Sequence, residues 1–129
     1  MKKFTRILAL TLVLVMSVAM FASCAAPNKD PKKAKEALEK NDYTIALFVE
    51  GEEAEAAGAV MKLEKLTGLI SASKDKDLVE IFYFEDAAAA DAALDTIQEL
   101  SDKAGNEVKV KKSGSMVYYG TAAAIKAAK

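Results

Sequence analysis

An uncharged apolar run near the start of the chain limits what the remainder can fold into. The run extends from Ile7 to Ala22, behind a short cationic stretch and ahead of small residues. This arrangement is typical of a secretory signal peptide. The run is also slightly short for a transmembrane helix, which needs roughly 17–25 apolar residues. We therefore expect residues 1–23 to be a signal peptide, and the remainder is long enough for one domain with a modest core.

The only cysteine of the chain, Cys24, follows this run after one residue, Ser23. The stretch from Phe21 to Cys24 resembles a bacterial lipobox, in which small residues precede the cysteine, although Phe21 stands where that family usually has leucine. The resemblance implies that Cys24 carries a diacylglyceryl group and acyl chains such as palmitate, and that cleavage occurs just before it. Ordinary secretion with cleavage after Ala25 and an uncleaved anchor are the alternatives.

The lipobox resemblance also implies a location and a division of the chain. We expect residues 24–30 to be a lipidated tether and residues 31–129 to be a single α+β domain. Two or more acyl chains hold a protein stably on a bilayer. The tether is short, so the domain is expected close to the cell membrane, on its extracytoplasmic face.

Composition excludes several classes of function. Residues 1–23 carry three of the 18 basic residues and none of the 19 acidic ones, so the remainder has 15 basic and 19 acidic residues. Such a balance offers no basic field for nucleic acid, which is not expected as a partner. The chain has no histidine, and lipidation would consume its one thiol. Histidine-dependent nucleophilic catalysis is thereby excluded, and we expect no cofactor, no metal and no catalytic residue.

Sequence periodicity predicts an alternating order of helices and strands. Apolar residues at helical spacing mark the helices, and β-branched or alternating runs mark the strands. Helices are expected at 31–41, 52–66, 87–103 and 122–129, and strands at 43–49, 69–73, 78–84, 107–112 and 115–119. The first strand has apolar residues on both faces, so we expect it to be covered on both sides.

The central part of this order, βαββαβ, matches the ferredoxin-like arrangement. The predicted fold is therefore α+β, with a ferredoxin-like core extended by a fifth strand, a mainly antiparallel sheet, and short flanking N- and C-terminal helices. In that arrangement the fourth strand lies at an edge beside the first, and the fifth strand extends the sheet beyond it. One face of the sheet is expected to pack on the helices at 52–66 and 87–103.

A turn at Ser113-Gly114 would set the register of the last hairpin. It pairs Val110 with Val117 and Val108 with Tyr119, on the face that packs against the two longer helices. The opposite face then carries a possible binding surface, whose members are Met116, Tyr118, Lys109 and Lys111. Only two short, alanine-rich helices are available to cover that face. We expect incomplete coverage, with a partner protein or a second copy docking there.

The joint between the last strand and the last helix is a candidate anion site. Gly120 and Thr121 place backbone N–H groups at a helix start, and such a start can bind an anion. The same two residues can also serve for chain geometry and helix capping alone.

The end of the chain carries a second resemblance. A hairpin closed by Ser-Gly, then Val-Tyr-Tyr-Gly-Thr, then a short Ala/Ile/Lys helix is similar to small uncharacterised lipoproteins of anaerobic Gram-positive bacteria. That family brings no established activity. The hypothesis is a non-enzymatic binding or interaction module of the cell envelope. The alternatives are a small enzyme that uses carboxylates or a tyrosine, and a self-associating structural subunit.

Overall fold

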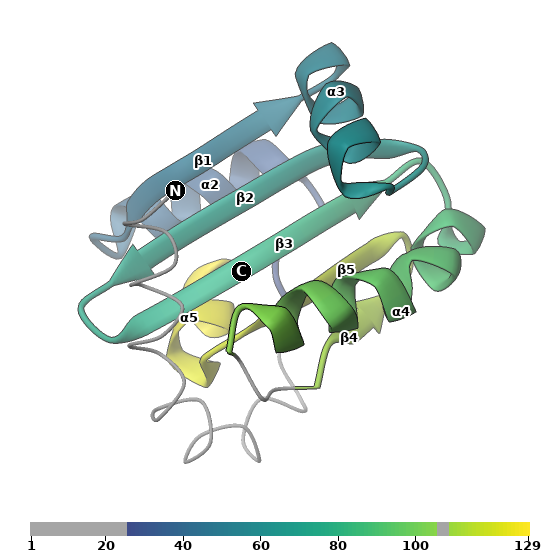
Figure 1. Ribbon diagram of the computed structural model, residues 1–129. Helices are drawn as coiled ribbons and strands as arrows, with labels where there is room; N and C mark the ends of the chain where they lie inside the picture. Colours follow the sequence, from purple (N-terminus) through teal and green to yellow (C-terminus); the bar gives the residue numbers. More distant parts are fainter. Residues whose placement is uncertain (1–25, 106–108) are drawn as a thin grey trace.

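The computed structural model describes residues 26–105 and 109–129. Its elements, in chain order, are α2 (Pro31–Lys40), β1 (Thr44–Glu50), α3 (Glu52–Met61), β2 (Leu66–Lys74), β3 (Asp77–Phe84), α4 (Ala87–Lys103), β4 (Lys111–Ser113), β5 (Met116–Gly120) and α5 (Ala122–Ala127). The predicted α+β class, the order of elements and the flanking helices are confirmed (Figure 1). Asp30, Asp86 and Thr121 cap α2, α4 and α5 through their side chains, as their positions predict.

The strands form one antiparallel sheet in the order β1-β2-β3-β5-β4. The expectation that β4 lies beside β1 is wrong, because the two strands are at opposite edges. Composition explains the order. Every residue of β5 is buried, whereas β4 reads Lys-Lys-Ser and is half-buried. The apolar strand takes the interior position beside β3, and the lysine-rich strand protects the edge.

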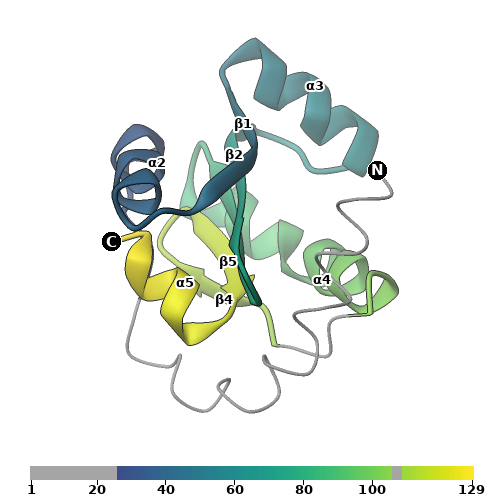
Figure 2. The ribbon, with the colours of Figure 1, turned by 90° about the vertical axis from the view of Figure 1, so that its left-hand side faces the viewer.

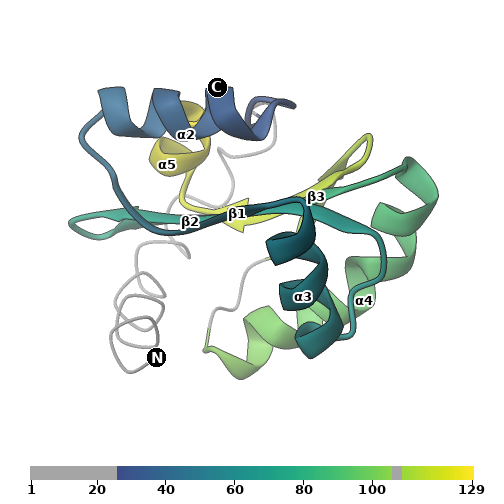
Figure 3. The same ribbon diagram turned by 90° about the horizontal axis from the view of Figure 1, so that it is seen from above.

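Two layers of helices cover the two faces of the sheet. Viewed from above, α2 and α5 lie on one side of the sheet, and α3 and α4 lie on the other (Figure 3). The packing of the sheet on α3 and α4 confirms the prediction for that face. We call these pairs the α2–α5 layer and the α3–α4 layer.

Helix α3 is shorter than its sequence predicts. It ends at Met61, and Lys62 adopts the left-handed conformation while the N–H of Leu63 donates to the carbonyl of Gly58 over 2.7 Å. A Cβ at Gly58 would lie 2.6 Å from the carbonyl oxygen of Leu63, so only glycine permits this tight turn. Within α3, Val60 has helical spacing with Leu63, yet it is 85% exposed, so the apolar spacing at 52–66 does not mark a continuous buried face.

Strand β1 is an edge strand, not a strand covered on both sides. Leu47 is 41% exposed, and none of the seven residues of the strand is fully buried. A register shift between Ile45 and Leu47 interrupts its pairing with β2. Apolar residues on both faces of this strand therefore did not predict full burial: Val49 packs toward the α3–α4 layer and Ile45 and Phe48 toward the α2–α5 layer, but each is only partly covered.

The register of the last hairpin differs from the prediction by two residues. Lys111 pairs with Tyr118 and Lys112 with Val117, because the turn is at Gly114-Ser115 rather than at Ser113-Gly114. A shift of two residues keeps every side chain on its predicted face. Val110 therefore still packs with Val117 and Tyr119 against the α3–α4 layer. Val108 lies outside the described residues.

The face toward the α2–α5 layer is closed. Its buried members come from both helices and from four strands or their flanks: Ala34, Leu38, Tyr43, Ile70, Ala72, Val79, Ile81, Tyr83, Met116, Tyr118, Ala124, Ile125 and Ala128. Met116 is 2% exposed and Tyr118 is 4% exposed. The expectation of incomplete coverage is wrong, because small alanines let α2 and α5 approach the sheet closely enough to seal it.

The segment before α2 is part of the folded domain. Pro27 is buried, and Asn28 bonds to the end of α5 through its N–H to the carbonyl of Ala128 (2.8 Å) and its side-chain amide to the carbonyl of Lys129 (2.9 Å). The hydroxyl of Tyr83 donates to the carbonyl of Asn28 over 2.7 Å. The domain thus begins before the predicted boundary at residue 31, and most of the predicted tether is not free.

Candidate functional site

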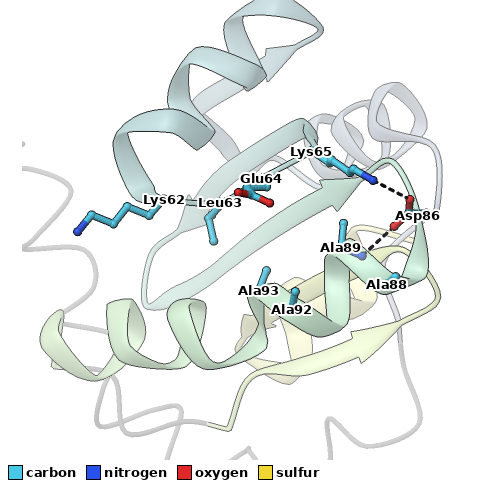
Figure 4. Close-up of a pocket in the computed structure, with 9 residues that line it drawn as sticks. All are labelled: Lys62, Leu63, Glu64, Lys65, Asp86, Ala88, Ala89, Ala92 and Ala93. Atoms are coloured by element: carbon cyan, nitrogen blue, oxygen red, sulfur yellow. Dashed lines mark hydrogen bonds and ion pairs between the residues drawn. The ribbon is translucent and has the colours of Figure 1, made fainter.

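A pocket lies between the α3–β2 connection and the first half of α4. Its volume is about 370 Å³, and its lining residues are Lys62, Leu63, Glu64, Lys65, Asp86, Ala88, Ala89, Ala92 and Ala93. Figure 4 shows the alanines of α4 along one wall and Leu63 facing them, while Lys62 points away. The pocket therefore has an apolar floor and a rim of charged side chains.

Backbone geometry is unusual on the connecting wall of this pocket. Lys62 and Lys65 both have positive φ, at 61° and 60°. Non-glycine residues in the left-handed region cost roughly 1–2 kcal/mol each. The first of them ends α3, and the second precedes β2, so the two lysines shape the short turn between a helix and a strand. This local requirement explains both without a ligand.

The charges on the rim are partly paired. Lys65 Nζ lies 3.6 Å from Asp86 Oδ2, and the other oxygen of Asp86 accepts from the N–H of Ala89 over 2.8 Å (Figure 4). Asp86 is thus a helix cap as well as an ion-pair partner. The lining contains no serine, cysteine, histidine or tyrosine. Among the lining residues, lysines and carboxylates are therefore the ionisable groups, and two of them, Lys65 and Asp86, are paired with each other.

A second polar feature is buried inside the sheet. Ser71, Glu80 and Tyr119 are register partners on β2, β3 and β5, so they form a row across the face toward the α3–α4 layer. Glu80 is 4% exposed, and among the described residues neither its Oε2 nor Oγ of Ser71 has a hydrogen-bond partner. Apolar neighbours on the same face, Leu78 and Phe82, flank the carboxyl along its own strand.

This burial changes the acidity of the row. Loss of hydration raises the pKa of Glu80 to about 8, and the Ser71 hydroxyl opposes part of that rise although its geometry makes no hydrogen bond. Burial also raises the pKa of Tyr119 far above its usual range, and the carboxyl of Glu80 adds to that rise. Glu80 is therefore largely protonated at neutral pH, and the row is a set of neutral hydroxyl and carboxyl groups.

The predicted binding surface is split between the interior and the edge of the sheet. Met116 and Tyr118 are buried, so they cannot form an exposed docking face. Lys109 is exposed and Lys111 half-buried at the β4 edge, where both line a shallow depression together with Tyr118. Of the predicted surface, therefore, the two lysines are accessible, whereas Met116 and Tyr118 are not.

The predicted anion site has a structural role. Gly120 and Thr121 are both buried. The N–H of Thr121 donates to the carbonyl of Leu78 (2.9 Å), and its hydroxyl accepts from the N–H of Ala124. Gly120 has φ of 155°, and a Cβ there would lie 2.3 Å from the carbonyl oxygen of Leu78. These residues join β5 to α5 and cap the helix, and α5 is only six residues long.

Cys24, the predicted lipid attachment site, lies outside the described residues. Within the part of the chain that is described, no helix is both long and apolar enough to cross a bilayer. In those same residues, no group of three or more His, Cys, Asp or Glu side chains is arranged to hold a metal ion.

Comparison with protein-family models, with curated proteins and with solved structures finds no match to this chain. The functional argument therefore depends on its own residues. Of those, Glu80 had a visible signal in the sequence, since it is the one charged residue within the run Leu78–Phe84. The pocket had none, because its wall depends on where α3 ends.

Proposed function

We propose that the chain is an exported envelope protein anchored by lipid at Cys24 to the extracytoplasmic face of the cell membrane. The observation that carries the proposal is the lone cysteine at the end of an uncharged apolar run, preceded by Ala22 and Ser23. The short distance along the chain between Cys24 and the folded domain supports this proposal. Because Pro27 and Asn28 are already bound to the domain, an anchor at Cys24 would hold the domain directly against the bilayer.

We propose further that the domain is a non-enzymatic binding or interaction module. Both sheet faces are packed, and the pocket between α3 and α4 has an alanine wall and no serine, cysteine, histidine or tyrosine among its lining residues. An enzyme of this size would need convergent polar groups in an accessible cleft. The absence of histidine from the chain supports the same proposal.

The alternative is a small enzyme that uses a carboxylate and a tyrosine. The raised pKa of Glu80, next to Tyr119, favours it, because such shifts often occur at catalytic sites. Access argues against it, since the Glu80 side chain is almost fully buried. Carbodiimide labelling of the folded protein, measured by mass spectrometry, distinguishes the small enzyme from the non-enzymatic binding module. Rapid labelling of Glu80, at the rate of exposed Glu99, would favour the enzyme.

The anchor is tested by the mass of the N-terminal peptide after expression of the full chain in a bacterium. We expect a peptide that begins at acylated Cys24. The variant Cys24→Ala should keep its leader, whereas Ser23→Ala, which preserves a small residue before the cysteine, should be processed like the wild type. An unmodified peptide that begins at Ala26 would indicate ordinary secretion, and one that begins at Met1 an uncleaved anchor.

The partner of the module is proposed to be another protein or a second copy of the chain. Its contact surface is not the predicted one, because Met116 and Tyr118 are buried. Cross-linking of the membrane-bound protein through its surface lysines distinguishes the two partners. A product of twice the mass of the chain indicates self-association, and a product of another mass indicates a different protein.

A further inference from the structure

The two helical layers carry opposite charge. Around the α2–α5 layer, residues 29–42 and 122–129 contain seven lysines and four side-chain carboxylates. Around the α3–α4 layer, residues 51–65 and 85–105 contain three lysines and ten carboxylates. The chain is nearly neutral as a whole, so this contrast is a property of how the fold distributes its charge. The two layers lie on opposite sides of the sheet (Figure 2).

The basic side is also exposed. Lys29, Lys32, Lys33, Lys126 and Lys129 are all exposed, and none of the five takes part in an ion pair among the described residues. Within α2, Lys35 pairs with Glu39 at 3.5 Å, which neutralises one lysine of the layer. Most of the positive charge of this layer therefore faces solvent and is available to an anionic surface.

The anchoring end of the chain leaves the domain on this same side. Ala26 packs against the cluster under α2 and α5, and Asn28 bonds to the last residues of α5. Cys24 is two residues before Ala26, so their Cα atoms are at most about 7 Å apart. A lipid on Cys24 would therefore enter the bilayer next to the α2–α5 layer, and the domain has little freedom to turn away.

From these observations we infer that the α2–α5 layer is the membrane-facing side of the domain and lies against an anionic lipid surface. The inference rests on the proposed lipid anchor. Lysines next to a membrane anchor are attracted to anionic headgroups, by about a fivefold change in affinity for each lysine. The ten carboxylates of the α3–α4 layer are repelled by the same headgroups and point outward. The pocket of Figure 4 then faces away from the membrane.

The test uses the acylated full chain in vesicles of phosphatidylcholine and phosphatidylglycerol. The acylated Cys24 leaves no free thiol, so a single new cysteine can be labelled with a fluorophore. Ala123→Cys places the label on α5, and Ala92→Cys places it on α4; both positions are exposed. With quencher-labelled lipid headgroups, we expect the label at 123 to be quenched several times more strongly than the label at 92.

Charge reversal provides the matched control. The pair Lys32→Glu and Lys33→Glu changes the basic layer, and the pair Lys62→Glu and Lys103→Glu changes the acidic layer by the same net charge. All four lysines are exposed, so both variants should fold. We expect the first pair to lower the ratio of the basic-side-down to the acidic-side-down orientation by more than about 20-fold, whereas the second pair should not lower it, because it adds negative charge only to the side that faces away from the lipid. Vesicles of phosphatidylcholine alone should reduce the contrast between the two labels.

The outcomes separate this inference from the proposed function. If Cys24 is acylated but the two labels are quenched equally, or the label at 92 is quenched more, the orientation is wrong and the anchor stands. In that case the lysines of the α2–α5 layer would bind a protein partner with an acidic surface instead of lipid. If the two charge-reversal pairs act alike, lipid charge does not orient the domain, and the inference fails. An unmodified Cys24 removes both the anchor and the inference.

Discussion

Glu80 should make the domain less stable as the pH rises. Its pKa is about 8 in the folded domain and 4.5 as the ordinary value. A group whose folded pKa is raised contributes its full stability below the unfolded pKa and loses it as the pH rises to the folded pKa. Between about pH 5 and about pH 8, the free energy of unfolding should fall by about 4 kcal/mol. That is a large share of the stability of a small domain.

The perturbation is Glu80→Gln, which keeps the shape of the side chain and removes its titration. The assay is chemical denaturation at several pH values, followed by circular dichroism. At neutral pH we expect the variant to be more stable than the wild type by about 3 kcal/mol, because the wild type must keep a proton that the unfolded chain releases. Below about pH 4, under the unfolded pKa, the two proteins should be nearly equally stable.

The control is Glu99→Gln, which removes an exposed carboxylate from α4. It should follow the wild-type pH dependence. The reasoning is refuted if Glu80→Gln and Glu99→Gln show the same stability at every pH, because Glu80 would then be hydrated in the folded protein. A variant that is destabilised equally at all pH values would mean that the carboxyl has a hydrogen-bonding role instead.

Two further substitutions, with one glycine control, test how the ends of the domain are held. Gly120→Ala should cost about 4 kcal/mol in thermal unfolding, because its Cβ would meet the carbonyl oxygen of Leu78 at 2.3 Å and disrupt the β3–β5 pairing. Gly114→Ala has open space and a φ of 62°, so it should cost only about 1–2 kcal/mol; equal losses would contradict the clash. Tyr83→Phe should cost about 1 kcal/mol and speed amide exchange at Asn28, since it removes a 2.7 Å hydrogen bond. Unchanged amide exchange at Asn28 would mean that the segment before α2 is held in place without the Tyr83 hydrogen bond.

The sequence predicts those parts of the fold that depend on local chemistry. The capping residues Asp30, Asp86 and Thr121 placed three helix starts correctly, because a side-chain oxygen next to free N–H groups is a local interaction. The predicted face of Val110, Val117 and Tyr119 in the last hairpin was also correct, since side chains alternate along a strand whatever its register. The failures concern interactions between distant segments.

Strand order shows why those interactions are difficult to predict. The pattern of elements also allows an order in which β4 lies beside β1. In the observed order β5 takes the place beside β3, and β4 pairs with β5 at the far edge of the sheet. The end of α3 is a similar case. Leu63 and Leu66 have helical spacing with Val60, but they are buried by the turn and by β2 rather than by a helix. Spacing alone does not distinguish these two ways of burying a leucine.

The same limit explains why the charge asymmetry is invisible in the sequence. Basic and acidic residues alternate in blocks along the chain, and the total is close to neutral. The asymmetry arises because lysine-rich α2 packs beside α5 and the C-terminal residues that carry Lys126 and Lys129, on one sheet face, while the two acidic helices α3 and α4 pack on the other (Figure 2). The hydrogen bonds from Asn28 to the end of α5 hold the start of the described chain on the basic side. Anchor position and charge therefore follow from one packing arrangement, and they favour the same orientation at a membrane.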